Sequence, residues 1–187
     1  MDAITALTQR VSVAKLQEPG PSEEQLAQML GAAVRAADHG LLRPWRFLLV
    51  QGEGRQKLGQ VFCEAAVADS PHMSEAAQQK FRNMPLRAPC LLLVIASVQE
   101  HPKVPAQEQI ISAGAAAQNI INAAYALGLG AMWRTGDMAY NHRVTDALGL
   151  GANEELVGYI YLGTPATSPA EPKAPDVASL LQVWPNK

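Results

Sequence analysis

Hydrophobic and polar positions alternate along the chain with two periods, one typical of helices and the other of strands. The clearest helical stretch follows Ser22, where apolar residues recur at i, i+3, i+4, i+7 and i+8. Ser22 and Gln25 have the spacing of a capping box, in which each side chain bonds the other residue's backbone amide. We therefore expect a helix that begins after Ser22, ends near Ala36 or Ala37, and buries the stripe formed by Leu26, Met29, Leu30, Ala33 and Val34.

Other helical patterns are shorter or less regular, with one exception. Residues 106–127 form the longest candidate, rich in alanine and apolar almost all round, which predicts a helix in the centre of the protein. Gly128 and Gly149 have the position of C-terminal caps. Further helices are expected over residues 2–10, with Ile4 and Leu7 turned inward, and over residues 55–68, 74–83 and 141–148.

Extended segments are expected over residues 46–51, 90–96, 131–134 and 156–162. Cys90–Ala96 is apolar at every position, which predicts a strand buried on both faces. Strands and helices follow one another without a regular βαβ cadence. The pattern therefore predicts one α+β domain over residues 1–187, with a mid-sized sheet and helices packed around it.

The end of the chain has a different character. Residues 164–187 contain five prolines, which predicts an extended arm. The arm also carries Leu180, Leu181, Val183 and Trp184, which need an apolar partner. Two alternatives stay open at this point, since the arm could wrap a second copy of the chain or fold back onto its own domain.

Composition and charge exclude several classes of protein. The chain has 187 residues, of which 48% are hydrophobic, so it can build a core and is not disordered. Its net charge of −2 makes it a poor binder of nucleic acid and of anionic membranes, and any anion site must be a local cluster of cations. The two cysteines and four histidines have no metal-ligand spacing, so no metal is expected. Without a transmembrane-length run or a signal peptide, the expected location is the cytoplasm.

Three local clusters could carry chemistry. Arg10 to Lys15 combines two cations and a hydroxyl, which suits a phosphate clamp but also describes a surface charge pair at a helix end. Ser12 and Lys15 match the Ser-x-x-Lys pattern of serine acyl enzymes, without that class's accompanying motifs. The second cluster spans residues 35–46 and the third residues 133–136. In the second cluster the plain alternatives are that Trp45 packs in the core and that His39 is a solvent-exposed loop residue. In the third the plain alternative is that Arg134 is an edge-strand arginine. Glycine-rich nucleotide fingerprints are absent from the sequence.

Taken in order along the chain, these segments resemble the FMN-dependent nitroreductase family, in particular a branch of short chains. Each motif is weak alone, but their joint order and spacing span nearly the whole sequence. The matching stretches are Met1-Asp2-Ala3, Arg10-x-Ser12, Arg35-Ala36-x-Asp38-His39, Pro44-Trp45-x-Phe47, Glu53-Gly54-Arg55, Arg87-Ala88-Pro89, Lys103-Val104-Pro105, Trp133-Arg134-Thr135-Gly136 and Leu162-Gly163-Thr164-Pro165.

The resemblance implies an architecture and a set of ligands. It implies an α+β homodimer with a central, mainly antiparallel sheet surrounded by helices, a C-terminal arm that extends onto the partner, and FMN in a cleft at the interface. The residues implied to hold FMN from one subunit are Arg10, Val11, Ser12, Trp133, Arg134 and Thr135, and those reaching it across the interface are Arg35 and His39. The part associated with NADH or NADPH corresponds to Ala123, Ala124, Tyr125, Ala126, Leu127 and Gly128.

Two positions depart from the family pattern. Val11 stands where most relatives have a basic residue or histidine, which is harmless if the backbone amide makes the contact. Ala14 stands where many relatives have a basic residue, which leaves the role of the neighbouring Lys15 open.

The activity expected from the resemblance is that of an FMN-dependent NAD(P)H oxidoreductase, which reduces nitroaromatic, quinone or similar acceptors by a ping-pong mechanism. In such an enzyme flavin N5 carries the hydride, so no catalytic side chain is expected. Two alternatives differ in class. One is an FMN-binding sensor or storage module without turnover, and the other is an acyl-transfer enzyme that uses Ser12 and Lys15.

Overall fold

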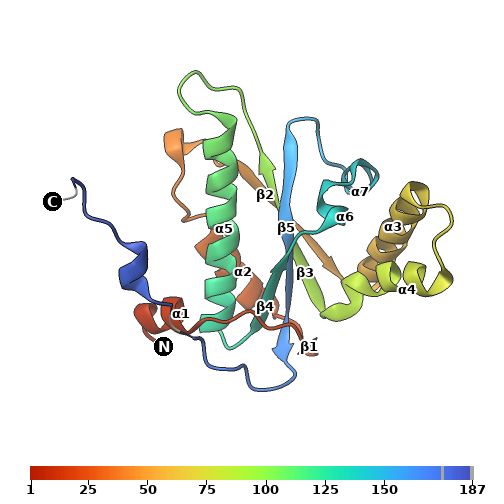
Figure 1. Ribbon diagram of the computed structural model, residues 1–187, viewed down its shortest axis with the longest axis horizontal. Helices are drawn as coiled ribbons and strands as arrows, with labels where there is room; N and C mark the ends of the chain where they lie inside the picture. Colours follow the sequence, from red (N-terminus) through yellow and green to blue (C-terminus); the bar gives the residue numbers. More distant parts are fainter. Residues whose placement is uncertain (174, 186–187) are drawn as a thin grey trace.

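The computed structural model describes residues 1–173 and 175–185 (Figure 1). Helices and strands fall close to the predicted segments, and the capping box of the second helix is present in full. In chain order the elements are α1 (Ala3–Gln9), β1 (Leu16–Gln17), α2 (Glu23–Ala33), η1 (His39–Leu41), β2 (Trp45–Gln51), α3 (Glu53–Asp69), α4 (Glu75–Asn83), η2 (Met84–Arg87), β3 (Cys90–Ser97), α5 (Ala106–Ala126), β4 (Gly130–Arg134), α6 (Asp137–Tyr140), α7 (His142–Ala147), β5 (Glu154–Pro165) and η3 (Val177–Leu180).

The sheet is antiparallel throughout, as expected. Within the described residues it has five strands, with β3 between β2 and β5. The other edge of β5 pairs first with β4 and then with β1, so one long strand holds both short ones. The pairing of Leu16–Gln17 with Thr164–Pro165 was not predicted, because two residues are too few to show a strand period.

Helices cover both faces of this sheet, which explains why β3 is apolar at every position. Leu91, Leu93 and Ile95 pack on the side of α3, whereas Leu92 and Val94 pack on the side of α2 and α5. Figure 1 shows α5 and α2 on one side of the strands and α3, α4, α6 and α7 on the other. The predicted burial of Cys90–Ala96 on both faces is thus confirmed.

Three expectations about helices were wrong in detail. Ile4 and Leu7 point outward, with 68% and 59% of their surface exposed, because α1 is buried at Ala6 instead. Helix α2 ends at Ala33, three residues early, and leaves Val34 exposed beyond its end. Helix α5 covers one face of the sheet rather than the molecular centre, so Ile111 on its outer side is 62% exposed.

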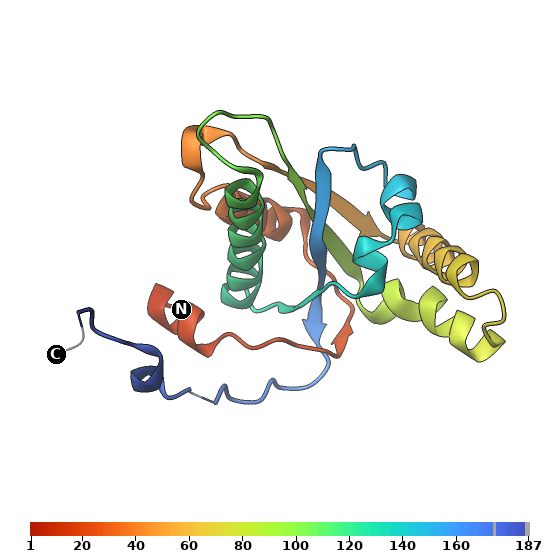
Figure 2. The ribbon, with the colours of Figure 1, turned by 45° about the horizontal axis from the view of Figure 1, so that its top comes forward.

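Where it is described, over residues 164–173 and 175–185, the C-terminal arm is extended, as predicted, apart from the turn η3; the rest of the predicted arm lies outside the described residues. It leaves β5 at Pro165 and runs out past α1, away from the helices that cover the sheet (Figure 2). Its apolar side chains contact little of their own chain, and the exposed ones are Val177, Leu180, Leu181, Val183 and Trp184. Across residues 1–173 and 175–185, the structure has no helix that is both long and apolar enough to cross a membrane.

A half-buried ion pair joins Arg46 of β2 to Glu154, the first residue of β5. Arg46 donates through Nε and a terminal nitrogen to the two carboxylate oxygens of Glu154, at 2.6 and 2.7 Å. These bonds lower the pKa of Glu154 from its ordinary value of 4.5 to about 2. Because the folded pKa is the lower one, the stabilisation is complete above pH 4.5 and is lost as the pH falls toward 2.

We therefore expect Glu154→Gln to lower the free energy of unfolding by about 2 kcal/mol at pH 7, and by much less near pH 3. Urea unfolding at the two pH values measures this difference. Glu155→Gln, which removes the exposed neighbouring carboxylate, is the control and should cost less than about 0.5 kcal/mol. An equal cost of Glu154→Gln at both pH values would contradict the pairing.

Candidate functional site

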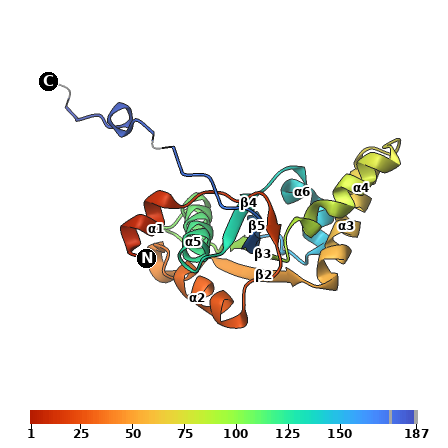
Figure 3. The ribbon, with the colours of Figure 1, turned by 90° about the horizontal axis from the view of Figure 1, so that it is seen from below.

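The segment from Arg10 to Lys15 lies against β4, although more than a hundred residues separate them in sequence. The amide of Val13 donates to the carbonyl of Ala131 at 2.9 Å. The approach is close, since a Cβ on Gly130 would lie 2.5 Å from a methyl of Leu16. Seen from below, the segment passes beside β4 between α1 and β1 (Figure 3). Two of the predicted cofactor-binding segments, 10–12 and 133–135, are thus brought to the same edge of the sheet.

A groove of about 550 Å³ runs between this segment and the start of the C-terminal arm. Val11 to Lys15 form one wall and Thr167 to Lys173 the other. Its charged lining groups are the ammonium groups of Lys15 and Lys173 and the carboxylate of Glu171, and the exposed hydroxyl of Ser12 lies beside them. Cations and hydroxyls at a chain segment with free amides are the donors that a phosphate prefers.

A second pocket of about 450 Å³ opens where β4 ends, on the α3 and α4 side of the sheet. Aromatic and sulfur-containing side chains form most of its wall, and two guanidinium groups stand at it. Its lining residues are Phe62, Phe81, Met84, Arg87, Arg134, Thr135, Gly136, Asp137, Met138, Tyr159 and Tyr161. Such a wall suits a planar ring system that carries polar or negative groups at its edge.

In this second pocket the neutral phenol of Tyr161 lies near two positive charges, those of Arg87 and Arg134. The guanidinium of Arg134 lies 5.7 Å from the ring centre of Tyr161, in cation–π range. Burial raises the pKa of Tyr161, and the guanidinium groups of Arg87 and Arg134 oppose that rise. Among the described residues, neither arginine forms an ion pair. The pocket therefore offers hydrogen-bond donors and positive charge to a ligand.

Trp133 and Arg134 point to opposite faces of the sheet, as consecutive strand residues must. Trp133 packs with the core on the α5 side and donates from Nε1 to the carbonyl of Val157 at 3.2 Å. Its indole lies over Gly158, where a Cβ would collide with it. Of the predicted residues on β4, Arg134 and Thr135 thus line the second pocket, whereas Trp133 supports the strand from the other side.

His39 lies away from this edge within the chain. His39 is tied to Glu108 in the first turn of α5, while the segment from Arg10 lies near β4, beyond the last turn of α5. Since α5 has 21 residues, its two ends are about 30 Å apart. Arg35 and His39 are both exposed, and one chain does not bring His39 to the residues of segment 10–12.

The segment predicted to bind nicotinamide forms the last turn of α5 and the turn that follows it. Gly128 has a φ of 79° and caps the helix, as predicted. Ala124 is completely buried in the core, so its side chain is not available to a ligand. The exposed members of this segment are Ala126 and Gly128.

Two other features bear on the alternatives. Ser12 and Lys15 form no hydrogen bond with each other in the described part of the chain, so an activated serine is not seen. Cys90 is buried and its pKa is raised by that burial to about 11, so it is not a nucleophile at neutral pH.

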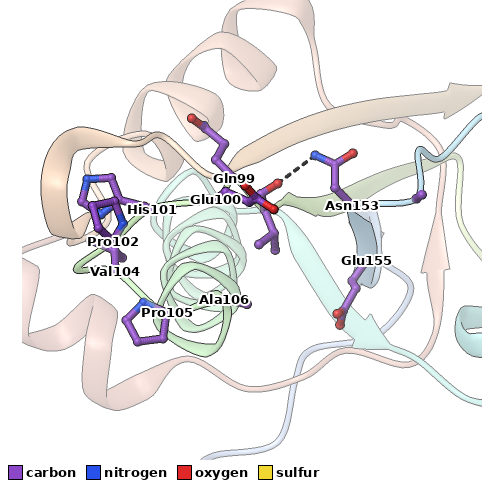
Figure 4. Close-up of a pocket in the computed structure, with 11 residues that line it drawn as sticks. Gln99, Glu100, His101, Pro102, Val104, Pro105, Ala106, Asn153 and Glu155 are labelled. Atoms are coloured by element: carbon purple, nitrogen blue, oxygen red, sulfur yellow. Dashed lines mark hydrogen bonds between the residues drawn. The ribbon is translucent and has the colours of Figure 1, made fainter.

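A third cavity, of about 790 Å³, lies at the opposite end of the sheet from β1. It is formed by the loop that precedes α5 and by the start of β5 (Figure 4). Asn153 closes one side by donating to the carbonyl of Val98 at 2.8 Å. The cavity is open and none of the predicted cofactor residues lines it.

Sequence reasoning missed most of the aromatic wall and one cation. Phe81, Met84 and Arg87 come from α4 and η2, and only Arg87 stood in a segment noted for its motif. Lys173 lies in the arm, where composition predicts only extended chain. These residues come together through tertiary contacts, so no local spacing could have indicated them.

Comparisons with known proteins agree with one another. The sequence profile described as the nitroreductase family matches residues 7–164. The protein named "Putative NAD(P)H nitroreductase YdjA" of Escherichia coli K12 is 41% identical over 165 residues, which cover 88% of this chain and 89% of that protein.

Two solved structures show the same fold. A nitroreductase-like family protein from Bacillus cereus matches with a TM-score of 0.84 and 21% identity, over 100% of this chain and 97% of that one. A nitroreductase with bound FMN from Bacteroides fragilis matches with a TM-score of 0.72 and 17% identity, over 98% of each chain.

Proposed function

Because this chain belongs to the nitroreductase family, we propose that it is an FMN-dependent NAD(P)H oxidoreductase that works as a homodimer. When bound, FMN would accept a hydride from the nicotinamide and pass electrons to a nitroaromatic, quinone or similar acceptor in a second half-reaction. The observation that carries the proposal is that one strand, β4, adjoins both candidate sites. One backbone hydrogen bond, from Val13 to Ala131, sets a cationic groove beside the strand that ends at an aromatic pocket.

The groove is proposed to hold the phosphate. Lys15 and Lys173 line it from two sides, and Arg10, the C-cap of α1, directly precedes its lining residues in sequence without itself lining the groove. A buried or half-buried dianion needs several such donors, since its loss of hydration must be replaced. Val11 fits this proposal because its backbone amide, rather than a basic side chain, would face the anion. Lys173 ties the arm to the cofactor, so binding would also order the arm.

The second pocket is proposed to receive the ring and to exclude water from it. Arg134 and Thr135 would supply donors to the ring's polar edge, and Arg87 would add positive charge. The neutral hydroxyl of Tyr161 is a further donor. Positive charge and donors at this place stabilise the negative charge that a flavin gains on reduction, which favours electron transfer from the nicotinamide.

The homodimer is supported by apolar surface that the single chain leaves uncovered. Outward-facing side chains on α1, on the outer side of α5 and on the arm include Ile4, Leu7, Ile111, Leu181 and Trp184. Soluble chains rarely expose so many large apolar groups unless another surface covers them. A second copy would also bring Arg35 and His39 of one chain toward the groove of the other, and for His39 the length of α5 prevents this within one chain.

An anaerobic spectral titration tests the proposal. Purified protein should bind FMN with a shift of the flavin absorbance, and NADH or NADPH should then bleach the bound flavin. Riboflavin, which lacks the phosphate, should bind at least tenfold more weakly. Failure to bind FMN would overturn the proposal. Bound flavin that neither nicotinamide bleaches would instead indicate a module that binds FMN without turnover.

A further inference from the structure

His39 stands on a loop whose backbone is held in an unusual conformation. Leu41 and Arg43 have positive φ values of 55° and 49°, which residues with a Cβ rarely adopt. The carboxylate of Asp38 accepts from the amides of Leu42 and Arg43, at 3.2 and 2.7 Å, and so closes the loop on itself. Conformations of this kind persist where the surrounding structure holds them, and they are common where a side chain must be placed accurately.

The loop is also tied to the segment that precedes α5, which Figure 4 shows in close-up. Gln99 donates from its side chain to the carbonyl of Leu42 at 2.9 Å. Gln99 is itself fixed by Gln109 of α5, a buried amide that accepts from the Gln99 amide and donates to the carbonyls of Gln99 and Val104. The His39 loop is therefore connected to α5 through a satisfied buried side chain.

The third tie holds the imidazole itself. Nδ1 of His39 lies 2.7 Å from a carboxylate oxygen of Glu108, in the first turn of α5. A carboxylate at neutral pH only accepts hydrogen bonds, so Nδ1 carries the proton. Nε2 is then the ring nitrogen left for another partner, and no bond to it occurs among the described residues. The ring is thus fixed in both orientation and tautomer, as in a histidine prepared to meet a ligand.

We propose that Glu108 is a positioning residue, which holds His39 so that Nε2 is presented across the dimer interface to the FMN site of the other subunit. The inference rests on the proposed function and adds to it a residue outside every segment assigned to the cofactor. The pair is exposed on both sides, at 66% and 47%, so it adds little to stability by itself. The role proposed for the pair is therefore the placement of the ring.

The test compares variants at both positions by FMN titration of the intact dimer. Glu108→Ala should raise the dissociation constant for FMN about fivefold to tenfold. Glu108→Gln keeps an acceptor oxygen for Nδ1 and should recover most of that loss. In a His39→Ala background, Glu108→Ala should have no further effect, because the positioned ring is then absent. Glu53→Ala is the matched control, since it removes an exposed carboxylate from the first turn of α3.

The outcomes separate this inference from the function on which it rests. If the wild-type protein binds no FMN, the proposed function fails. If it binds FMN and Glu108→Ala binds equally well, only the role of Glu108 is overturned. An equal loss with and without His39 would likewise overturn it, since Glu108 would then act without the imidazole. Melting temperatures should agree across the single variants within about 2 °C, which shows that the changes are not changes of fold.

Discussion

Arg10→Ala should weaken FMN binding about 100-fold while leaving riboflavin binding nearly unchanged. Arg10 is the guanidinium that ends α1 directly before the groove, and a charge-assisted hydrogen bond to a phosphate contributes about 1.5–3 kcal/mol. Losing it raises the dissociation constant for FMN about 10-fold to 100-fold, and the larger value applies when both bonds of a bidentate guanidinium are lost. Fluorescence titration with FMN and with riboflavin measures the difference directly.

A matched control removes the same side chain elsewhere. Arg143→Ala deletes an exposed arginine whose nearest carboxylate oxygen, on Asp69, lies 3.9 Å away. Its effect on FMN affinity should stay below twofold. Lys173→Ala should give an intermediate loss, of about tenfold, because its single ammonium group makes fewer bonds than a guanidinium. If Arg10→Ala weakens FMN and riboflavin equally, Arg10 does not contact the phosphate.

Gly59→Ala should destabilise the protein by about 3 kcal/mol, although alanine is the better helix former. Gly59 lies inside α3 where α4 crosses, and a Cβ there would collide with the backbone carbonyl oxygen of Arg82. A backbone oxygen cannot turn aside as a side chain can, so α4 must shift and its contacts must loosen. For a chain of this length, the expected fall in melting temperature is about 6–12 °C.

The same substitution in an open place should have the opposite sign. Gly31 lies within α2, and a Cβ there meets no atom within 4 Å. Gly31→Ala should therefore stabilise the protein by about 0.5–1 kcal/mol through helix propensity and a less flexible unfolded chain. Thermal unfolding of both variants and the wild type measures whether the two melting temperatures shift in opposite directions. A stable Gly59→Ala protein would show that α3 and α4 are not packed as closely as described.

A shifted α4 should also disturb the second pocket. Phe81 belongs to α4 and Met84 to the turn directly after it, and both line that pocket. We therefore regard Gly59 as a residue that sets the width of the proposed ring site from a distance. A glycine is required at this position because α3 and α4 pack closely there, and no pattern among the neighbouring residues in the sequence indicates it.

Local features of the fold were predictable because their causes are local. The capping box of Ser22 and Gln25, the cap at Gly128 and the strand Cys90–Ser97 depend on neighbours within a few residues or on a simple apolar run. The segment Arg10–Ser12 was likewise singled out through residue types and order, and its role in binding FMN stays a prediction. In each case the physical chemistry of a short window decides the structure.

Patterns that reach beyond a short window were ambiguous. The stripe of Ile4 and Leu7 was assigned to the core of the same chain, yet both side chains are exposed. An apolar stripe shows that a helix needs a partner but does not say which surface provides it. The arm poses the same question, and Leu181 and Trp184 stay uncovered in the single chain.

The sequence by itself determined the order of the longer helices and strands, the doubly buried central strand and the family motifs, because these follow from side-chain periodicity and from local hydrogen-bonding rules. Only the tertiary structure decided that Arg134 rather than Trp133 faces the second pocket, that Lys173 lines the groove, and that Glu108 holds His39. These pairs are distant in sequence or depend on which face of the sheet is covered. Their proximity is set by the antiparallel pairing of β4 with β5 and by the packing of α5 on the sheet, which are properties of the folded chain as a whole.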